Sequence, residues 1–254
     1  MYAGKLSIVM PVYNEAGAIA QNLAATSRIA AALAEAYEII AVNDGSADDT
    51  WAQIKQAAQL DPHIIPLFSP ANEGKGAALR HGTQIATGDL IAFCDADLDL
   101  CPSQLSGFIR LMKEKNADVV IGSKMHKDSK VNYPFLRKVY SWMYYCCLLI
   151  LFRLNTKDTQ TGLKLFKAEV IKPTMRQILV KRFAFDIEVL SIVNRRGYQI
   201  VSAPIEVVFR RVRFGRIKWA DIRNMVLDTL AVFYRLYILR YYDRQAEEVK
   251  EADA

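Results

Sequence analysis

Residues 90–99, LIAFCDADLD, place three aspartates at alternate positions directly after five apolar residues. The apolar run predicts a buried strand, Leu90–Asp95, and alternate side chains of an extended chain point to the same side. We therefore expect the carboxylates of Asp95, Asp97 and Asp99 to converge where this strand leaves the core. Crowded carboxylates repel one another unless a cation lies between them, and oxygen ligands suit Mg²⁺ or Mn²⁺. The stretch predicts a divalent-metal site; the plain structural alternative is a solvated acidic turn that caps the next helix.

Apolar strands alternate with amphipathic helices around this stretch. The expected strands are Leu6–Val12, Glu38–Val42, Ile64–Phe68, Leu90–Asp95 and Asp118–Gly122, and the expected helices run to about Ala36 and over Asp48–Leu60, Gly76–Ala86 and Pro102–Asn116. This alternation predicts an α/β fold with a mostly parallel sheet flanked by helices. Ligands of such sheets bind beyond the carboxyl ends of the strands. Polar groups fall there at residues 13–15 (YNE), 43–46 (NDGS) and 95–99.

The regular alternation of strands and helices changes after residue 122. The pattern predicts an apolar helix over residues 134–154, a strand Leu163–Phe166, helices near Ala168–Leu179 and Ile187–Arg196, a strand Gln199–Phe209 and a final helix after the basic loop 210–218. Two strongly apolar stretches, residues 139–152 and 225–239, are shorter than the roughly 20 residues that span a bilayer. Each is either a buried helix or a helix lying in a membrane interface.

Charge divides the chain in two. The 254 residues carry a net charge of +6, but residues 1–120 hold 8 basic against 14 acidic residues, whereas residues 121–254 hold 25 against 13. An acidic half followed by a basic half suits a metal-binding module joined to a surface for anionic partners. Nucleic acid, anionic lipid and a phosphate-bearing substrate all fit. The four cysteines have no zinc spacing, and no secretory signal precedes the first strand, which favours a reduced, cytosolic setting.

Other short motifs carry weaker signals. Residues 72–78, NEGKGAA, put a lysine between two glycines at a helix start. This pattern is typical of phosphate binding, but its specificity is low, and a plain turn is the structural alternative. Asp44 follows the second strand and can reach a nucleotide base or ribose, whereas Asp48 is better explained as a helix cap. In residues 185–188, FDIE, the simplest structural interpretation is that Asp186 caps the start of a helix. Glu188 would then be an acidic residue in the first turn, where the helix dipole favours it.

The order of these motifs resembles the inverting glycosyltransferases of family two, over residues 5 to 240. Within that family it is similar to the polyprenol-phosphate branch of dolichyl-phosphate mannose synthases and glucosyltransferases. The motifs that carry the resemblance are PVYNE at 11–15, NDGS at 43–46, GKG at 74–76, DAD at 95–97, GSK at 122–124, DTQTG at 158–162 and FDIE at 185–188.

The resemblance implies a fold and a division of the chain. It implies a GT-A-type nucleotide-sugar-binding fold with C-terminal amphipathic helices at a membrane interface. Residues 1–240 would form one domain, in which 1–122 bind the nucleotide sugar and metal and 123–240 bind the acceptor. Residues 241–254 would be a polar tail.

The resemblance also implies site residues. The nucleotide sugar would be bound by Pro11, Tyr13, Glu15, Asp44, Lys75 and Asp95. The metal, Mg²⁺ or Mn²⁺, would be held by Asp95, Asp97 and Asp99. The catalytic set would be Asp97, Lys124, Arg137, Lys164, Asp158 and Gln160. Three of these, Lys124, Arg137 and Lys164, match positions that grip the acceptor phosphate, usually as arginines, and lysine there keeps the charge but loses the bidentate fork.

The implied reaction is metal-dependent transfer of a hexose, from UDP-glucose or GDP-mannose, to a polyprenyl phosphate at the cytoplasmic face of a membrane, by a peripheral protein that binds no nucleic acid. A phosphate monoester has a second pKa of about 6, so near neutral pH it attacks without a general base. The three histidines lie outside the motifs. A same-fold transferase acting on a saccharide or protein hydroxyl would need a base such as Asp158 or Asp186. A non-catalytic membrane-surface module would leave the clustered aspartates unexplained.

Overall fold

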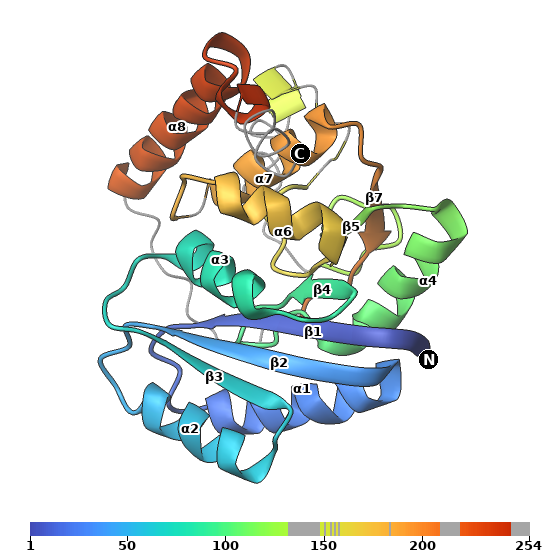
Figure 1. Cartoon of the computed structure of the whole chain (residues 1–254), viewed down its shortest axis with the longest axis vertical. Coiled ribbons are helices and arrows are strands. Elements are labelled where there is room, and N and C mark those ends of the chain that lie inside the picture. Colours follow the sequence, from blue (N-terminus) through green and yellow to red (C-terminus); the bar gives the residue numbers. More distant parts are fainter. Residues whose placement is uncertain are drawn as a thin grey trace, which may run out of the picture.

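The computed structural model describes residues 1–131, 148–149, 151–152, 154, 156, 158–182, 184–208 and 219–244. Within these residues, seven strands form one sheet in the order β3-β2-β1-β4-β6-β5-β7 (Figure 1). The strands are β1 (Tyr2–Val12), β2 (Ala34–Asp44), β3 (Ile64–Ser69), β4 (Leu90–Phe93), β5 (Val119–Ser123), β6 (Lys164–Lys167) and β7 (Ile200–Pro204). All neighbours pair in parallel except β6, which is antiparallel to both β4 and β5. The predicted mostly parallel sheet is confirmed.

Helices cover both faces of the sheet (Figure 1). They are α1 (Ile19–Leu33), α2 (Thr50–Leu60), α3 (Lys75–Ile85), α4 (Leu105–Lys115) after a short 3₁₀ turn η1 (Pro102–Gln104), α6 (Ala168–Gln177), α7 (Phe185–Arg195) and α8 (Trp219–Phe233), which continues in the π-helical turn η2 (Tyr234–Ile238). Helices α1, α2 and α4 pack on one face, and α3, α6 and α7 on the other. The predicted flanking helices are confirmed.

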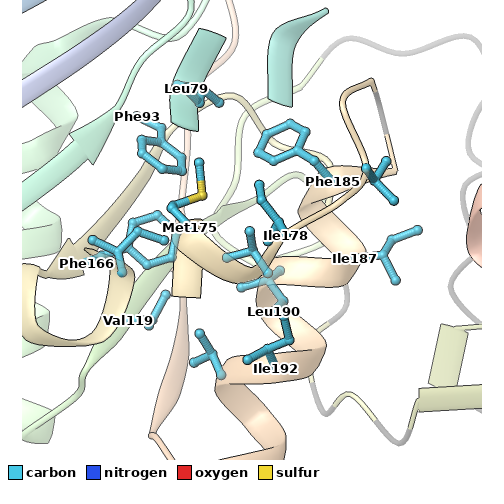
Figure 2. Close-up of a cluster of buried hydrophobic side chains, with 14 of the residues drawn as sticks. Leu79, Phe93, Val119, Phe166, Met175, Ile178, Phe185, Ile187, Leu190 and Ile192 are labelled. Carbon is cyan, nitrogen blue, oxygen red and sulfur yellow. The ribbon is translucent and has the colours of Figure 1, made fainter. Parts of the chain in front are cut away.

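Two hydrophobic clusters fill the space between these layers. Along β2, Ile39 and Ala41 enter the cluster under α1, α2 and α4, while Ile40 and Val42 enter the cluster under α3, α6 and α7. Because both faces are buried, the strand reads as a continuous apolar run rather than an alternating one. Figure 2 shows the second cluster, in which side chains from β4, β5, β6, α3, α6 and α7 meet.

Tertiary pairing overrides the local signal at two places. Ala34 and Ala36, predicted at the end of a helix, lie in β2, where they pair with Tyr2 and Lys5 of β1. The helix propensity of alanine contributes less free energy than the hydrogen bonds that this strand pairing supplies. Strand β7 ends at Pro204, earlier than the predicted Phe209, and Glu206 N instead donates 2.8 Å to the Gln104 side chain.

The C-terminal region differs from the predicted tail at its start. Tyr242, assigned to the polar tail, is 2% exposed and belongs to the second cluster. Most of the predicted helix 134–154, the basic loop 210–218 and residues 245–254 lie outside the described residues. Among the helices that the structure describes, none is long and apolar enough to cross a membrane.

Candidate active site

The predicted residues gather at the carboxyl edge of the sheet. Tyr13 follows β1, Asp44 closes β2, and Asp95 lies two residues beyond β4. Strand β6 runs the opposite way, so its first residue, Lys164, reaches the same edge. The register places Lys164 opposite Phe93 of β4 and Ile121 of β5. One antiparallel strand therefore inserts a lysine from the second half of the chain beside the aspartates of the first half.

An ion pair joins the glycine-flanked lysine to the first aspartate. Lys75 Nζ lies 2.5 Å from Asp95 Oδ1, and both side chains are partly exposed. Burial alone would lower the pKa of Lys75, but the charges of Asp95 and Asp186 outweigh it, so the pKa lies above its ordinary value. Burial would likewise raise the pKa of Asp95, but Lys75 holds it below its usual range. Both groups are therefore charged at neutral pH, and Lys75 is placed to meet an anion bound beside Asp95.

The three aspartates do not follow the predicted alternation. Strand β4 ends at Phe93, and Leu98 turns the chain with a left-handed φ of 54°. Asp97 Oδ1 accepts 3.1 Å from Asp99 N. In the described part of the chain, no three His, Cys, Asp or Glu side chains converge as a metal-binding group. The expectation that three carboxylates converge is therefore wrong in this structure, because the segment is a turn and not an extended strand.

The pair Asp95 and Asp97 still fits a divalent cation. Burial and the neighbouring charge of Asp95 raise the pKa of Asp97 to about 6. Two carboxylates held so close are short of positive charge, and carboxylate oxygen is the ligand that Mg²⁺ and Mn²⁺ prefer. Such ions complete their shell with substrate phosphates, so two protein ligands suffice.

Gly162 packs directly on this acidic turn. A Cβ atom at Gly162 would lie 1.9 Å from Asp95 Oδ2, so any residue other than glycine would displace the Asp95 carboxylate. The residue is the last of the DTQTG motif, for which the sequence suggested no individual role. A glycine that closes a polar motif is a signal of close backbone approach, and that signal was available.

A buried ion pair lies next to the first. Lys164 Nζ lies 2.7 Å from Asp186 Oδ1, with side-chain exposures of 3% and 6%. Its ammonium also donates to the Thr161 carbonyl. Burial lowers the pKa of Lys164 and raises that of Asp186, although the ion pair opposes both shifts. In this structure Lys164 is thus buried and bound to protein partners, whereas the resemblance implied that it binds the acceptor phosphate.

The loop after β5 meets the DTQTG motif through Asp158. Its Oδ2 accepts 3.0 Å from Lys124 N, and its Oδ1 accepts 3.2 Å from Gln160 N. Lys124 Nζ lies 4.0 Å from the same carboxylate. The structure thereby brings Lys124, Asp158 and Gln160 together, while Arg137 lies outside the described residues.

The residues implied for the nucleotide occupy the ends of β1 and β2. Tyr13 is 49% exposed, whereas Asp44 is buried. The two carboxylate oxygens of Asp44 accept 2.9 Å hydrogen bonds from Glu73 N and Gly74 N. Asp44 therefore holds the loop that precedes Lys75. Pro11 lies within β1, and Glu15 N donates 2.8 Å to Thr50 Oγ1 at the start of α2.

The glycines around Lys75 admit a protein loop. A Cβ at Gly74, where φ is 102°, would lie 2.7 Å from the Lys181 carbonyl, and one at Gly76 would lie 2.7 Å from Phe185 Cβ. Ala77 N also donates to the Lys181 carbonyl at 3.2 Å. The first turn of α3 is thus covered by the chain that leads into α7. The close approach predicted from these glycines is present, but its partner is protein.

Known proteins are similar to this chain over most of its length. The family model described as Glycosyl transferase family 2 matches residues 7–185. A dolichyl-phosphate beta-glucosyltransferase (ALG5D) of Trichomonas vaginalis is 32% identical over 94% of this chain and 77% of its own length. Two further proteins of that name from the same organism are each 30% identical. The resemblance to the polyprenol-phosphate branch is confirmed.

Solved structures share the fold. Mannosyltransferase PcManGT from Pyrobaculum calidifontis, in complex with GDP-Man and Mn²⁺, superposes with a TM-score of 0.63 at 18% identity, covering 94% of this chain and 65% of that one. Glucosyl-3-phosphoglycerate synthase from Mycobacterium tuberculosis, in complex with Mn²⁺, UDP and glucosyl-3-phosphoglycerate, gives 0.67 at 19% identity, covering 91% and 79%. The GT-A fold expected from the motifs is confirmed.

Proposed function

Because this chain belongs to glycosyl transferase family 2 and is a glycosyltransferase, we propose that it moves glucose from UDP-glucose to a polyprenyl phosphate of the dolichyl type. The acceptor and the sugar are supported by the names of the relatives that are 30–32% identical. GDP-mannose is the competing donor, since a structural neighbour binds it. One domain, ending beyond Tyr242, would carry both donor and acceptor sites.

The observation that carries the proposal is the state of the two candidate bases. A hydroxyl acceptor needs a carboxylate that can take a proton. Asp186 is covered and paired with Lys164, and Asp158 accepts two backbone hydrogen bonds. A phosphate dianion needs no base and is attracted by cations, which Lys75 and Lys124 supply at this edge. The geometry therefore favours a phosphate over a hydroxyl.

The donor would bind between Lys75 and the acidic turn. Asp95 and Asp97 would hold Mg²⁺ or Mn²⁺, and the ion when bound would neutralise the charge of the leaving diphosphate. Asp44 fixes the loop before Lys75, so the ammonium meets the diphosphate without a large rearrangement. Positioning and charge stabilisation then account for the chemistry.

A lipid-linked acceptor requires contact with a membrane. Helix α8 exposes Val226, Leu227 and Leu230, and the turn η2 continues the row with Tyr234 and Ile238. From Leu227 onward these positions recur every three to four residues, and Val226 precedes Leu230 by four, so they lie on one face of the helix. The opposite face is buried through Val232 and Leu236. We propose that the exposed row lies on the membrane surface as the predicted interfacial helix, on the cytoplasmic side.

The test offers the purified protein radiolabelled UDP-glucose or GDP-mannose with polyprenyl phosphate, with and without a chelator. We expect label in the organic phase from UDP-glucose alone, and only with Mg²⁺ or Mn²⁺ present. Asp97→Ala should reduce transfer at least about 100-fold. Glu114→Gln, an exposed acid on α4, is the control and should transfer normally. Transfer that survives chelation, or label from neither donor, would overturn the proposal.

A further inference from the structure

The buried carboxylate of Glu188 connects three separate parts of the chain. Its Oε2 accepts from Leu179 N at 3.0 Å and Val180 N at 2.8 Å. Its Oε1 accepts from Arg235 Nη2 at 3.2 Å and from the Tyr242 hydroxyl. Arg235 Nε also donates 3.0 Å to the Tyr242 oxygen. The side chain has no exposure to solvent, so it is fully committed to these four donors.

The backbone that Glu188 holds is the same one that covers the first turn of α3. We call residues 178–182 the covering loop. The Lys181 carbonyl accepts from Ala77 N, and Lys181 Nζ lies 3.2 Å from Glu73 Oε2. The Val180 carbonyl would lie 2.9 Å from a Cβ at Gly76. The loop thus contacts the residues on both sides of Lys75.

The flanks of the covering loop are fixed by the core. Ile178, its first residue, and Phe185, which follows it, belong to the same buried cluster as Leu79 of α3 (Figure 2). Val180, in its middle, also belongs to this cluster, and the backbone N–H groups of Leu179 and Val180 both donate to Glu188. A hydrogen bond to a buried charged group is stronger than one between neutral groups, so Glu188 is the main polar constraint on Leu179 and Val180.

We propose that Glu188, Arg235 and Tyr242 are positioning residues for the donor site. They tie the segment that follows α8 to the covering loop, and the loop sets the place of Lys75 against Asp95. The C-terminal segment then helps to position the donor site, in addition to forming part of the molecular surface. This inference rests on the proposed function in one respect, which is that the sheet edge at Lys75 is the donor site. The contacts of Glu188 do not depend on the proposed function.

The test compares Tyr242→Phe with Asp243→Asn by hydrogen–deuterium exchange. Tyr242→Phe removes one donor from Glu188 and keeps the ring in the core. Asp243→Asn breaks the 2.6 Å ion pair with Arg195, which joins the same segment to α7 without touching Glu188. We expect Tyr242→Phe to speed exchange of the Leu179 and Val180 amides about fivefold, the change that suits one lost hydrogen bond. Asp243→Asn should leave those amides unchanged.

A kinetic arm separates this inference from the proposed function. With UDP-glucose, Tyr242→Phe should raise the donor KM about fivefold and leave the acceptor KM unchanged, because only the Lys75 edge is displaced. Unchanged exchange in Tyr242→Phe, or equal acceleration in Asp243→Asn, would refute the positioning role. A wild-type protein that transfers no glucose while Tyr242→Phe still loosens the loop would refute the proposed function and leave the positioning role standing.

Discussion

At the scale of single residues, the site depends on how closely two backbones approach. Gly162 touches Asp95, and Asp95 pairs with Lys75, so the position of one carboxylate is set from two sides. The left-handed Leu98 adds a strained turn directly after Asp97. Strain of this kind persists only where the surroundings hold it, and it concentrates at functional sites.

Gly162→Ala should abolish transfer while the protein stays folded. The new methyl group would displace the tip of the Asp95 side chain, which can rotate, but only by leaving Lys75. We expect activity to fall at least about 100-fold, the size of loss typical of a removed electrostatic contact. Activity is measured by transfer of label, and folding by the melting temperature.

Gly107→Ala is the matched control, since no atom lies within 4 Å of its added Cβ on α4. It should stabilise the helix by about 0.5–1 kcal/mol and leave activity intact. Full transfer by Gly162→Ala would contradict the proposed place of Asp95 in the site.

At the scale of the elements, buried charges connect neighbouring strands and helices. Lys164 at the start of β6 and Asp186 in the first turn of α7 form a nearly fully buried ion pair. At the opposite edge of the sheet, Glu38 of β2 accepts from Ser7 of β1 at 2.6 Å and from Thr87 N at 2.6 Å. Losing one partner of such a pair costs more than the pair contributes, because the other charge stays buried.

Lys164→Met should destabilise the protein by about 3–5 kcal/mol, because Asp186 would lose its counter-charge. Adding Asp186→Asn should recover a large part of that loss. Lys167→Met on the same strand breaks a partly exposed ion pair with Asp118 and should cost at most about 1 kcal/mol. Urea denaturation measures all three. Equal effects at positions 164 and 167 would contradict the importance of burial.

Glu38→Gln should make stability less sensitive to acid. Burial alone would raise the pKa of Glu38, but hydrogen bonds from Lys5, Ser7 and Thr87 lower it below its ordinary 4.5. The carboxylate therefore stabilises the fold above about pH 4.5, and this contribution is lost as the pH falls through the lowered folded pKa. At pH 7 the variant should lose about 1–3 kcal/mol, and the difference should shrink at low pH.

Glu35→Gln, an exposed acid on the same strand, is the control and should unfold like the wild type at every pH. Denaturation midpoints between pH 3 and 7 measure the effect. A difference between Glu38→Gln and the wild type that stays constant down to pH 3 would exclude the proposed linkage.

At the scale of the whole molecule, helix α8, which carries most of the exposed apolar row, lies on the side of the sheet away from α1 and α2 (Figure 1). Contiguous exposed apolar side chains mark contact with a protein or a membrane. The membrane is the partner that a lipid-linked acceptor demands. The row and the donor site would then be connected through Glu188.

Leu227→Glu with Leu230→Glu should weaken binding to phospholipid vesicles at least about tenfold, since each buried leucine contributes about 1.5–3 kcal/mol. The melting temperature should stay unchanged, because both side chains are at least half exposed. Vesicle flotation measures the binding. Leu60→Glu, 83% exposed at the end of α2, is the control and should bind normally. Equal flotation of all variants would rule out this face as the membrane contact.

The sequence alone determined the α/β class and the family, and it predicted a site at the carboxyl edge of the sheet, because strand periodicity and short motifs are local features of the chain. It also predicted that Lys75, Asp95, Lys124 and Asp158 belong to one site, and the structure pairs Lys75 with Asp95 and Lys124 with Asp158. Tertiary structure alone decided that β6 runs antiparallel, that the 95–99 stretch turns before all three of its carboxylates can converge, and that Lys164 is covered. It also decided that Gly162 touches Asp95 and that Glu188 binds Tyr242. These outcomes depend on contacts between residues far apart in the chain, and such contacts leave no periodic trace in the sequence.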